Sequence, residues 1–311
     1  MLSRVAESVF WMSRYMERTN GVLRILRTNY VSSQNEVKDF SWQTLLRSYS
    51  DAPQKQLLSL ANESRKALHH LLLDRENDSS VINNITRARE NARAVQDHTT
   101  KEVWQCLNDY YHLIRQPAIE QQILHGDPLT AMDRLISDGM LYHGIVDVTM
   151  AREEPFYYVN IGKYIERAIL SVDMLQIKLT EIGYNLKEME DVPALRYLLY
   201  SLSGYEFYLK KHRGNFQAEL VLKQILFDAV FPHSVAFCLK RLLRYFDQLT
   251  PASLPESFKQ LEFLIGKANN TVNYTTLDIT NNEQLRNYLF QVRSELIDIT
   301  TGLNKYYFAN S

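Results

Sequence analysis

Apolar side chains recur at helical spacing over residues 2–27. They alternate in steps of three and four residues at Val5, Val9, Met12, Met16, Thr19, Leu23 and Leu26. This pattern is typical of a helix packed against a core. The opposite side contains Phe10 and Gly21, and between them lie Arg14 and Glu17, a cation and a carboxylate one turn apart. The pattern predicts a central, buried helix with an ion pair in an apolar setting.

The same helix pattern returns about half-way along the chain. Residues 14–18, RYMER, correspond to residues 163–167, KYIER, at an offset of 149 residues (164 − 15). Internal repetition at so large a spacing indicates duplication of a whole unit, not a short-period solenoid. The sequence therefore predicts two repeats, over about 1–150 and 151–311.

A second pair of segments supports the duplication. LLLDRENDSSV contains Asp74 and Ser80, and ILFDAVFPHSV contains Asp228 and Ser234 at the same spacing. Each segment predicts a helix, a tight turn and a capped helix. We interpret the two aspartates as turn residues, not as catalysts.

Helices are predicted over most of the remaining chain, because glycine (10) and proline (8) are scarce and no strand pattern competes. The predicted helices cover about 53–73, 81–97, 129–150, 255–270 and 282–307, with a short amphipathic piece at 42–46, a capping box at Thr99 and Glu102, and a loop over 271–280. The expected fold is all-α, a large helical bundle built from two duplicated units.

Composition and charge narrow the class of protein. The chain is 45% hydrophobic and 23% charged, with a net charge of −1, whereas nucleic-acid binders usually have a basic surface. No apolar run approaches the roughly 20 residues that span a bilayer, and Arg4, Glu7 and Arg14 interrupt any signal-peptide pattern. We expect a cytoplasmic protein that binds neither nucleic acid nor membrane.

Metal and cofactor motifs are missing from the sequence. There is no Gly-rich phosphate loop, GxSxG, HExxH or CxxC, and Cys106 and Cys238 form no recognisable zinc cluster. A di-iron bundle needs paired Glu-x-x-His motifs, and the nearest match is an isolated Asp109-x-x-His112. We expect no metal or cofactor, and a structural or solvent-exposed role for His69 and His70.

The repeated ion pairs are the first candidate site. One interpretation is ordinary side-chain pairing, worth a few tenths of a kcal/mol if exposed. The other is a polar cleft between the repeats, where Glu17 and Glu166 meet, bind a cation or amine, or act as general acid and base. The cations predicted to bind a ligand there are Arg14, Arg18, Lys163 and Arg167.

A second candidate lies at residues 87–93, RARENAR. Arg89 and Arg93 are four residues apart on one helix face, which suits binding of a carboxylate or phosphate. Glu90 and Asn91 complete the polar cluster, whereas Arg87 lies on a different side of the helix. The alternative is a solvent-exposed helix face.

These motifs resemble the bacterial alpha-E family. The family opening, L-S-R-V-A-E-S-x-x-W-x-x-R-Y-x-E-R, is matched from Leu2 to Arg18, and the A-R-E-N-A-R, I-E-R-A and D-x-x-x-P-x-S-V motifs are matched at residues 88–93, 165–168 and 228–235. Where the family continues A-E-N, this chain has Thr19, Asn20 and Gly21. Lys163 stands where arginine is commoner.

The resemblance implies a single alpha-E domain over residues 1–311. It says more about the partners of the protein than about any chemistry of its own. Such domains are encoded beside, or fused to, ATP-grasp-like ligases, often with a transglutaminase-like protein nearby. We therefore expect an accessory helical subunit of an amide or peptide ligase system, which binds the ligase, a peptide or both between the repeats. The alternatives are an enzyme that uses the paired glutamates and a purely structural scaffold.

Overall fold

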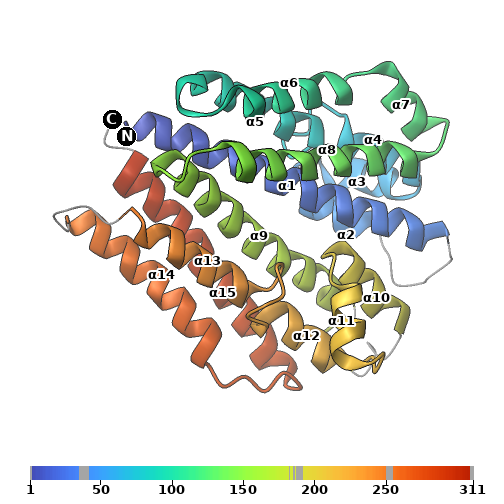
Figure 1. Ribbon diagram of the computed structural model, residues 1–311. Coiled ribbons are helices and arrows are strands. Elements are labelled where there is room, and N and C mark those ends of the chain that lie inside the picture. The colour runs from blue at the N-terminus through green and yellow to red at the C-terminus, as the bar shows by residue number, and fades with distance from the viewer. Residues whose placement is uncertain are drawn as a thin grey trace. The chain divides into compact units, whose positions relative to one another are not determined.

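The computed structural model describes residues 2–34, 42–181, 183–184, 186, 192–249 and 255–308. Over these residues the regular structure is entirely helical, which confirms the all-α class (Figure 1). The chain forms two compact units. We call residues 11–151 the N-terminal unit, and residues 2–10 with 152–308 the C-terminal unit. The duplication itself stays a prediction.

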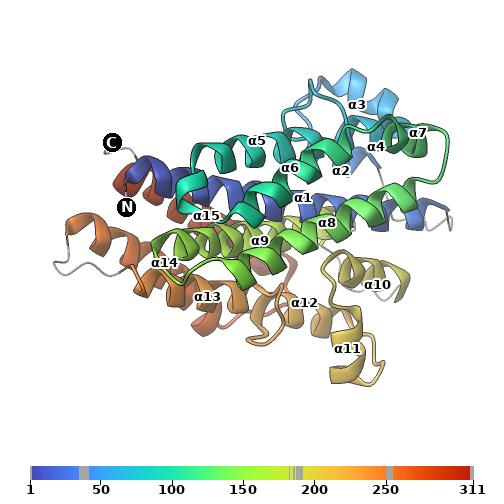
Figure 2. The ribbon, with the colours of Figure 1, turned by 45° about the horizontal axis from the view of Figure 1, so that its top comes forward.

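The N-terminal unit is built around helices α5, α6 and α8. Its elements are α1 (Ser3–Gln34) from Trp11 onward, α2 (Trp42–Ser48), α3 (Gln54–Ala61), α4 (Ser64–Leu72), α5 (Val81–Ala94), the 3-10 turn η1 (Gln96–His98), α6 (Lys101–Ile114), α7 (Pro117–Leu124) and α8 (Pro128–Thr149). Helix α6 packs against both α5 and α8 (Figure 2). Tyr110 of α6 is buried and donates a hydrogen bond to the carbonyl of Leu135 on α8, at 2.8 Å. This buried contact fixes the face that α6 and α8 present to each other.

The C-terminal unit is centred on helix α9. Its elements are α9 (Glu154–Glu181), α10 (Val192–Ser201), α11 (Tyr205–His212), α12 (Ala218–Phe227), α13 (Val235–Asp247), α14 (Glu256–Tyr274), α15 (Asn282–Leu303) and the π-helical turn η3 (Asn304–Phe308). Helix α9 packs against α13 and α15. A Cβ on Gly162 of α9 would lie 2.5 Å from the carbonyl oxygen of Phe10. Glycine is thus what lets α9 approach the start of α1 so closely.

Both repeated helices are buried on two sides, as the pattern predicts. The apolar stripe of α1 is buried from Val9 to Leu26, and Phe10, Arg14 and Glu17 on its opposite side are buried as well. On α9, Glu166 is buried and Lys163 is half-buried. The sequence therefore identified the central helix of the C-terminal unit and a buried helix of the N-terminal unit.

Several predicted helix boundaries are wrong. The helix expected over 53–73 is two helices, because Glu63 is extended (φ −131°, ψ 99°) and separates α3 from α4. The helix expected to reach residue 97 ends at Ala94 and passes into η1. The cap of α6 is Thr100, which accepts a hydrogen bond from the Val103 amide, whereas Thr99 donates back to the Val95 carbonyl.

The C-terminal boundaries differ as well. Helix α14 continues to Tyr274, into the segment predicted as a loop. Asn273 supports this last turn with a side-chain hydrogen bond of 2.8 Å to the Asn269 carbonyl. Helix α15 ends at Leu303, and the remaining turn to Phe308 is π-helical.

Candidate functional site

Glu17 lies at a buried polar contact between α1 and α8 of the N-terminal unit. Its side chain is 1% exposed, and its Oε2 lies 3.2 Å from Nε2 of His143, whose side chain is 21% exposed. Burying a carboxylate is costly unless hydrogen bonds or an opposite charge compensate it. His143 provides a donor when Nε2 carries a proton, and it links the buried carboxylate to the surface. No spacing pattern points to His143 in the sequence, because its partner Glu17 is 126 residues away (143 − 17).

Asn20 lies next to this contact, and its amide can donate to His143 Nε2 only in the tautomer in which Nε2 does not donate to Glu17. Its Nδ2 donates to the Gly139 carbonyl at 3.1 Å and lies 3.2 Å from His143 Nε2. A carboxylate at this position would place an oxygen against the Gly139 carbonyl, so the amide of Asn20 suits these surroundings. A Cβ on Gly139 would lie 1.9 Å from Asn20 Oδ1. Gly139 is therefore the residue that lets α8 approach Asn20.

The predicted ligand-binding cations of α1 lie beside aromatic rings of their own helix. The Arg14 guanidinium lies 4.6 Å from the Trp11 ring centre, and that of Arg18 lies 5.9 Å from the Tyr15 ring. Arg87 approaches the same Tyr15 ring at 5.9 Å and pairs with Asp78 at 2.8 Å. Arg87 is thus engaged away from Arg93, as the sequence predicts.

The second set of predicted residues lies on α9 of the C-terminal unit. Lys163 and Arg167 lie 4.7 and 5.5 Å from the Tyr164 ring. Arg167 also donates to the Pro232 carbonyl at 3.5 Å, in the turn before α13. Glu166 belongs to the C-terminal unit and Glu17 to the N-terminal unit. The meeting of the two glutamates in one cleft stays a prediction.

The Arg-Glu-Asn segment of α5 forms an internal ion-pair cluster. Arg89 pairs with Glu90 at 2.6 Å, and Arg93 approaches the other oxygen of Glu90 at 3.8 Å. Arg89 also donates to Asn108 and lies over the rings of Trp104 and Tyr111. Its side chain is 18% exposed, whereas that of Arg93 is 66% exposed. The carboxylate that the two arginines were predicted to bind is thus supplied by the chain itself. Asn91 is half-buried on the same helix.

The two aspartates are turn residues, as predicted. Asp74 accepts a hydrogen bond from the Glu76 amide, and its other oxygen lies 2.7 Å from His70 Nδ1. His70 is buried, and its Nε2 lies 2.7 Å from Ser50 Oγ, which confirms a structural position for this histidine.

In the C-terminal unit, Asp228 accepts from the amides of Val230 and Phe231 and pairs with Lys211. Burial raises the pKa of Asp228, but the Lys211 hydrogen bond and the backbone donors outweigh it and leave the pKa below its ordinary value. The same turn is thus anchored by a histidine in one unit and by a lysine in the other.

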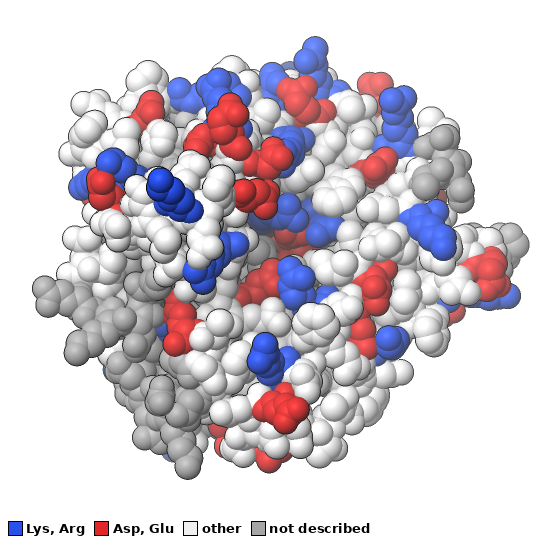
Figure 3. All heavy atoms as spheres, turned by 180° about the vertical axis from the view of Figure 1, so that it is seen from behind, with Lys and Arg blue, Asp and Glu red and all other residues white. Residues whose placement is uncertain are grey.

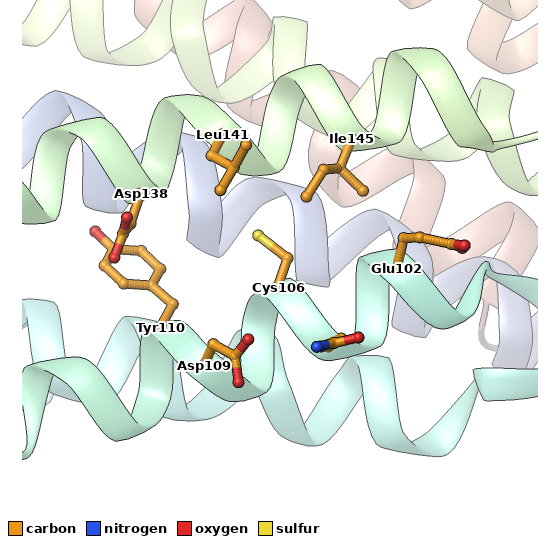
Figure 4. A pocket seen from close by; sticks show the side chains of 8 residues that line it. Glu102, Cys106, Asp109, Tyr110, Asp138, Leu141 and Ile145 are labelled. Carbon is orange, nitrogen blue, oxygen red and sulfur yellow. The ribbon is translucent and has the colours of Figure 1, made fainter.

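A groove lies between α6 and α8 of the N-terminal unit, with a volume of about 390 Å³ (Figure 4). Its lining residues are Glu102, Gln105, Cys106, Asp109, Tyr110, Asp138, Leu141 and Ile145. The volume falls within the range of small-ligand pockets. This groove was not predicted from the sequence. The available signal was the spacing of Glu102, Cys106 and Asp109, which places two carboxylates and a thiol on one helix face.

The lining of the groove is acidic on α6, whereas α8 contributes one carboxylate, Asp138, and the apolar side chains of Leu141 and Ile145. Three of its lining residues are carboxylates and none is a cation. By contrast, acidic and basic side chains are interspersed on the molecular face shown in Figure 3. Leu141 is 55% exposed. The Cys106 sulfur points toward α8, between Leu141 and Ile145 (Figure 4).

The electrostatics of the groove follow from this lining. Burial and the charges of Asp138 and Asp109 raise the pKa of the Cys106 thiol to about 12. Burial also raises the pKa of Asp138. The charge of Arg134 lowers this pKa and the charge of Asp109 raises it, and the net shift is upward. The negative charges of Asp138 and Asp109 therefore act on the thiol, an environment that attracts cations and disfavours a thiolate nucleophile.

A family model described as a predicted alpha-helical domain with a conserved ER motif matches residues 1–308. The chain belongs to the Alpha-E family. Its two Glu-Arg pairs are Glu17-Arg18 and Glu166-Arg167. In each pair the glutamate is buried, and the arginine is half-buried near a tyrosine ring.

The chain is similar to uncharacterized mycobacterial proteins. It is 23% identical over 261 residues to Mb2597 of Mycobacterium bovis, and 22% identical over the same length to Rv2567 of Mycobacterium tuberculosis. In each case the match covers 77% of this chain but 29% of the relative, so the chain spans less than a third of these proteins. No solved structure matches the chain.

Among the described residues, no group of three or more His, Cys, Asp or Glu side chains is arranged to hold a metal ion. No helix over these residues is long and apolar enough to cross a membrane.

Proposed function

We propose that this Alpha-E domain is an accessory module of an ATP-grasp-type amide or peptide ligase system. It binds the ligase, a peptide substrate or both, and contributes no catalytic group of its own. A transglutaminase-like protein is a further partner of the same system. We place the module in the cytoplasm, where a ligase of this type has access to ATP.

The observation that carries the proposal is the length of the relatives. The matched region makes up 29% of the mycobacterial proteins, so in them it accompanies a larger amount of other sequence. A helical domain joined to other sequence suits a module that acts with a partner. The pairing of Arg89 and Arg93 with Glu90 of the same helix supports this role, because these side chains form ion pairs with one another and show no catalytic arrangement. The open groove between α6 and α8 offers a surface for binding.

Co-purification tests this proposal. The tagged full chain, expressed with the ATP-grasp protein encoded nearest to it, is expected to form a complex at low salt that survives gel filtration. A matched control is the same ligase with an unrelated helical protein. If chain and ligase elute separately at micromolar concentration, and the chain also fails to change the ligase's rate of amide formation, the proposal is wrong.

The enzyme alternative rests on the buried contact between Glu17 and His143, since a carboxylate beside an imidazole is a common acid–base arrangement. It requires turnover by the isolated chain that disappears in Glu17→Gln or Glu166→Gln while the fold remains. The scaffold alternative predicts instead that these variants lose stability and that no partner binds.

A further inference from the structure

The groove between α6 and α8 has an asymmetric lining that specifies a class of ligand. Asp109 and Glu102 contribute negative charge from α6, and Asp138 contributes it from α8. Leu141 and Ile145 form an apolar wall on α8. A ligand that fits this surface needs a positive charge and an apolar stem next to it.

We propose that this groove binds a peptide segment through a lysine side chain, whose ammonium lies between Asp109 and Asp138 and whose alkyl stem packs on Leu141 and Ile145. The proposal rests on the proposed function and names the class of peptide that the module recognises. Lysine suits the site better than arginine, because an ammonium is a compact charge that can contact carboxylates on two sides. A guanidinium forms its best contacts in one plane with a single carboxylate.

Cys106 provides an observation that is independent of the carboxylates. It is 9% exposed, its sulfur points into the groove, and it has no hydrogen-bond partner among the described residues. A nearly buried, weakly polar floor suits the methylene groups of a lysine stem, which pack on apolar surface while the charged end stays near the rim. Cys106 is therefore part of the binding surface, without a covalent role.

The two aspartates also lack the compensation that structural carboxylates have in this protein. Asp228 pairs with a lysine and accepts two backbone hydrogen bonds. Asp138 has Arg134 in its surroundings, yet burial and Asp109 still raise its pKa. A ligand ammonium would supply the missing positive charge and lower the free energy of the charged pair.

Peptide binding to the full chain tests the proposal. The probes are the tripeptide amide acetyl-Leu-Lys-Leu and its norleucine analogue, which keeps the stem and lacks the ammonium. Methyl NMR of Leu141 and Ile145 reports binding at the groove. We expect saturable shifts of both methyl signals with the lysine peptide. The norleucine peptide should bind at least about fivefold more weakly at low salt, because it loses two partly exposed charge contacts with the carboxylates.

Matched variants separate the groove from the overall charge of the protein. Asp109→Asn/Asp138→Asn is expected to reduce binding of the lysine peptide at least about fivefold, to the level of the norleucine peptide. The control is Glu63→Gln/Glu120→Gln, which removes the same amount of charge outside the groove, since Glu63 precedes α4 and Glu120 lies on α7. It should leave binding of the lysine peptide unchanged. Equal binding of both peptides, shifts elsewhere without shifts at Leu141 and Ile145, or equal loss in both double variants would overturn the proposal. Failure of ligase co-purification with intact peptide binding would reject the ligase partner alone.

Discussion

The N-terminal unit contains two acidic regions that differ in how their charge is compensated. At the contact of α1 and α8, Glu17 is 1% exposed and lies against His143, next to Asn20. In the groove of α6 and α8, Asp109 and Asp138 line an open cavity that contains no cation in its lining. Carboxylates of the first kind hold helices together, whereas carboxylates of the second kind are available for a ligand. Substitutions in the two regions should therefore differ in their effects on stability and on ligand binding.

Removing the buried carboxylate should have the largest effect. We expect Glu17→Ala to lower the free energy of unfolding by about 3 kcal/mol or more, because it breaks the buried pair with His143 and removes a buried side chain from the contact of α1 and α8. Urea denaturation followed by circular dichroism measures this. Glu90→Ala on the surface of α5 is the control, with a loss of about 1 kcal/mol at most. Equal losses in the two variants would contradict a special role for burial.

The close approach of α8 to Asn20 gives the next largest effect. Gly139→Ala should cost about 1–3 kcal/mol of stability, since its Cβ would lie 1.9 Å from Asn20 Oδ1. Gly144→Ala on the same helix meets nothing within 4 Å, and should stabilise by about 0.5–1 kcal/mol through helix propensity. Thermal unfolding of both variants gives the comparison, and a stable Gly139→Ala protein would refute the predicted packing.

The pH dependence of stability should have opposite signs at the groove and at the Asp228 turn. The folded-state pKa of Asp138 is raised, so its favourable contribution is complete below the unfolded pKa and is lost as pH rises through the folded pKa. Asp138→Asn should therefore gain stability relative to the parent as pH rises from about 3 to 7. The pKa of Asp228 is lowered, so Asp228→Asn should lose stability relative to the parent over the same range.

Urea titrations at several pH values measure both slopes. The difference in stability between each variant and the parent is plotted against pH, which cancels the contribution of all other groups. Slopes of the same sign for Asp138→Asn and Asp228→Asn would show that the groove carboxylate is compensated like the turn carboxylate.

The smallest effect on stability is expected for Asp109→Asn. This exposed residue of α6 has no structural hydrogen bond among the described contacts, so its replacement should change the free energy of unfolding by no more than about 0.5 kcal/mol. Its effect should appear in binding of the lysine peptide. A stability loss comparable to that of Gly139→Ala would show that Asp109 holds the fold together, as Glu17 does, and is not reserved for a ligand.

The sequence predicted the helices well because their signals are local. The spacing of apolar residues identified α1 and α9, and the paired Asp–Ser segments identified both turns. Its errors lie at helix ends, where Glu63 and Thr100 adopt backbone conformations that only the packed structure decides. Such endings depend on competing hydrogen bonds that the apolar pattern does not record.

The candidate sites could be predicted only in part. Arg89, Glu90 and Arg93 are neighbours in sequence and do cluster, yet their pairing with one another follows from side-chain directions. His143 and Asp138 come close to α1 and α6 through helix packing over long separations. No residue pattern encodes such a contact in a single sequence. Whether Glu17 and Glu166 share a ligand remains a prediction of the repeat.

The central claim is that the groove carboxylates serve a ligand and not the fold. The direct measurement is the urea midpoint of Asp109→Asn/Asp138→Asn, with and without the acetyl-Leu-Lys-Leu amide peptide. We predict a variant at least as stable as the parent, whose midpoint the peptide does not raise, whereas the peptide raises that of the parent. A double variant as unstable as Glu17→Ala, or one that the peptide stabilises as much as the parent, would contradict the claim.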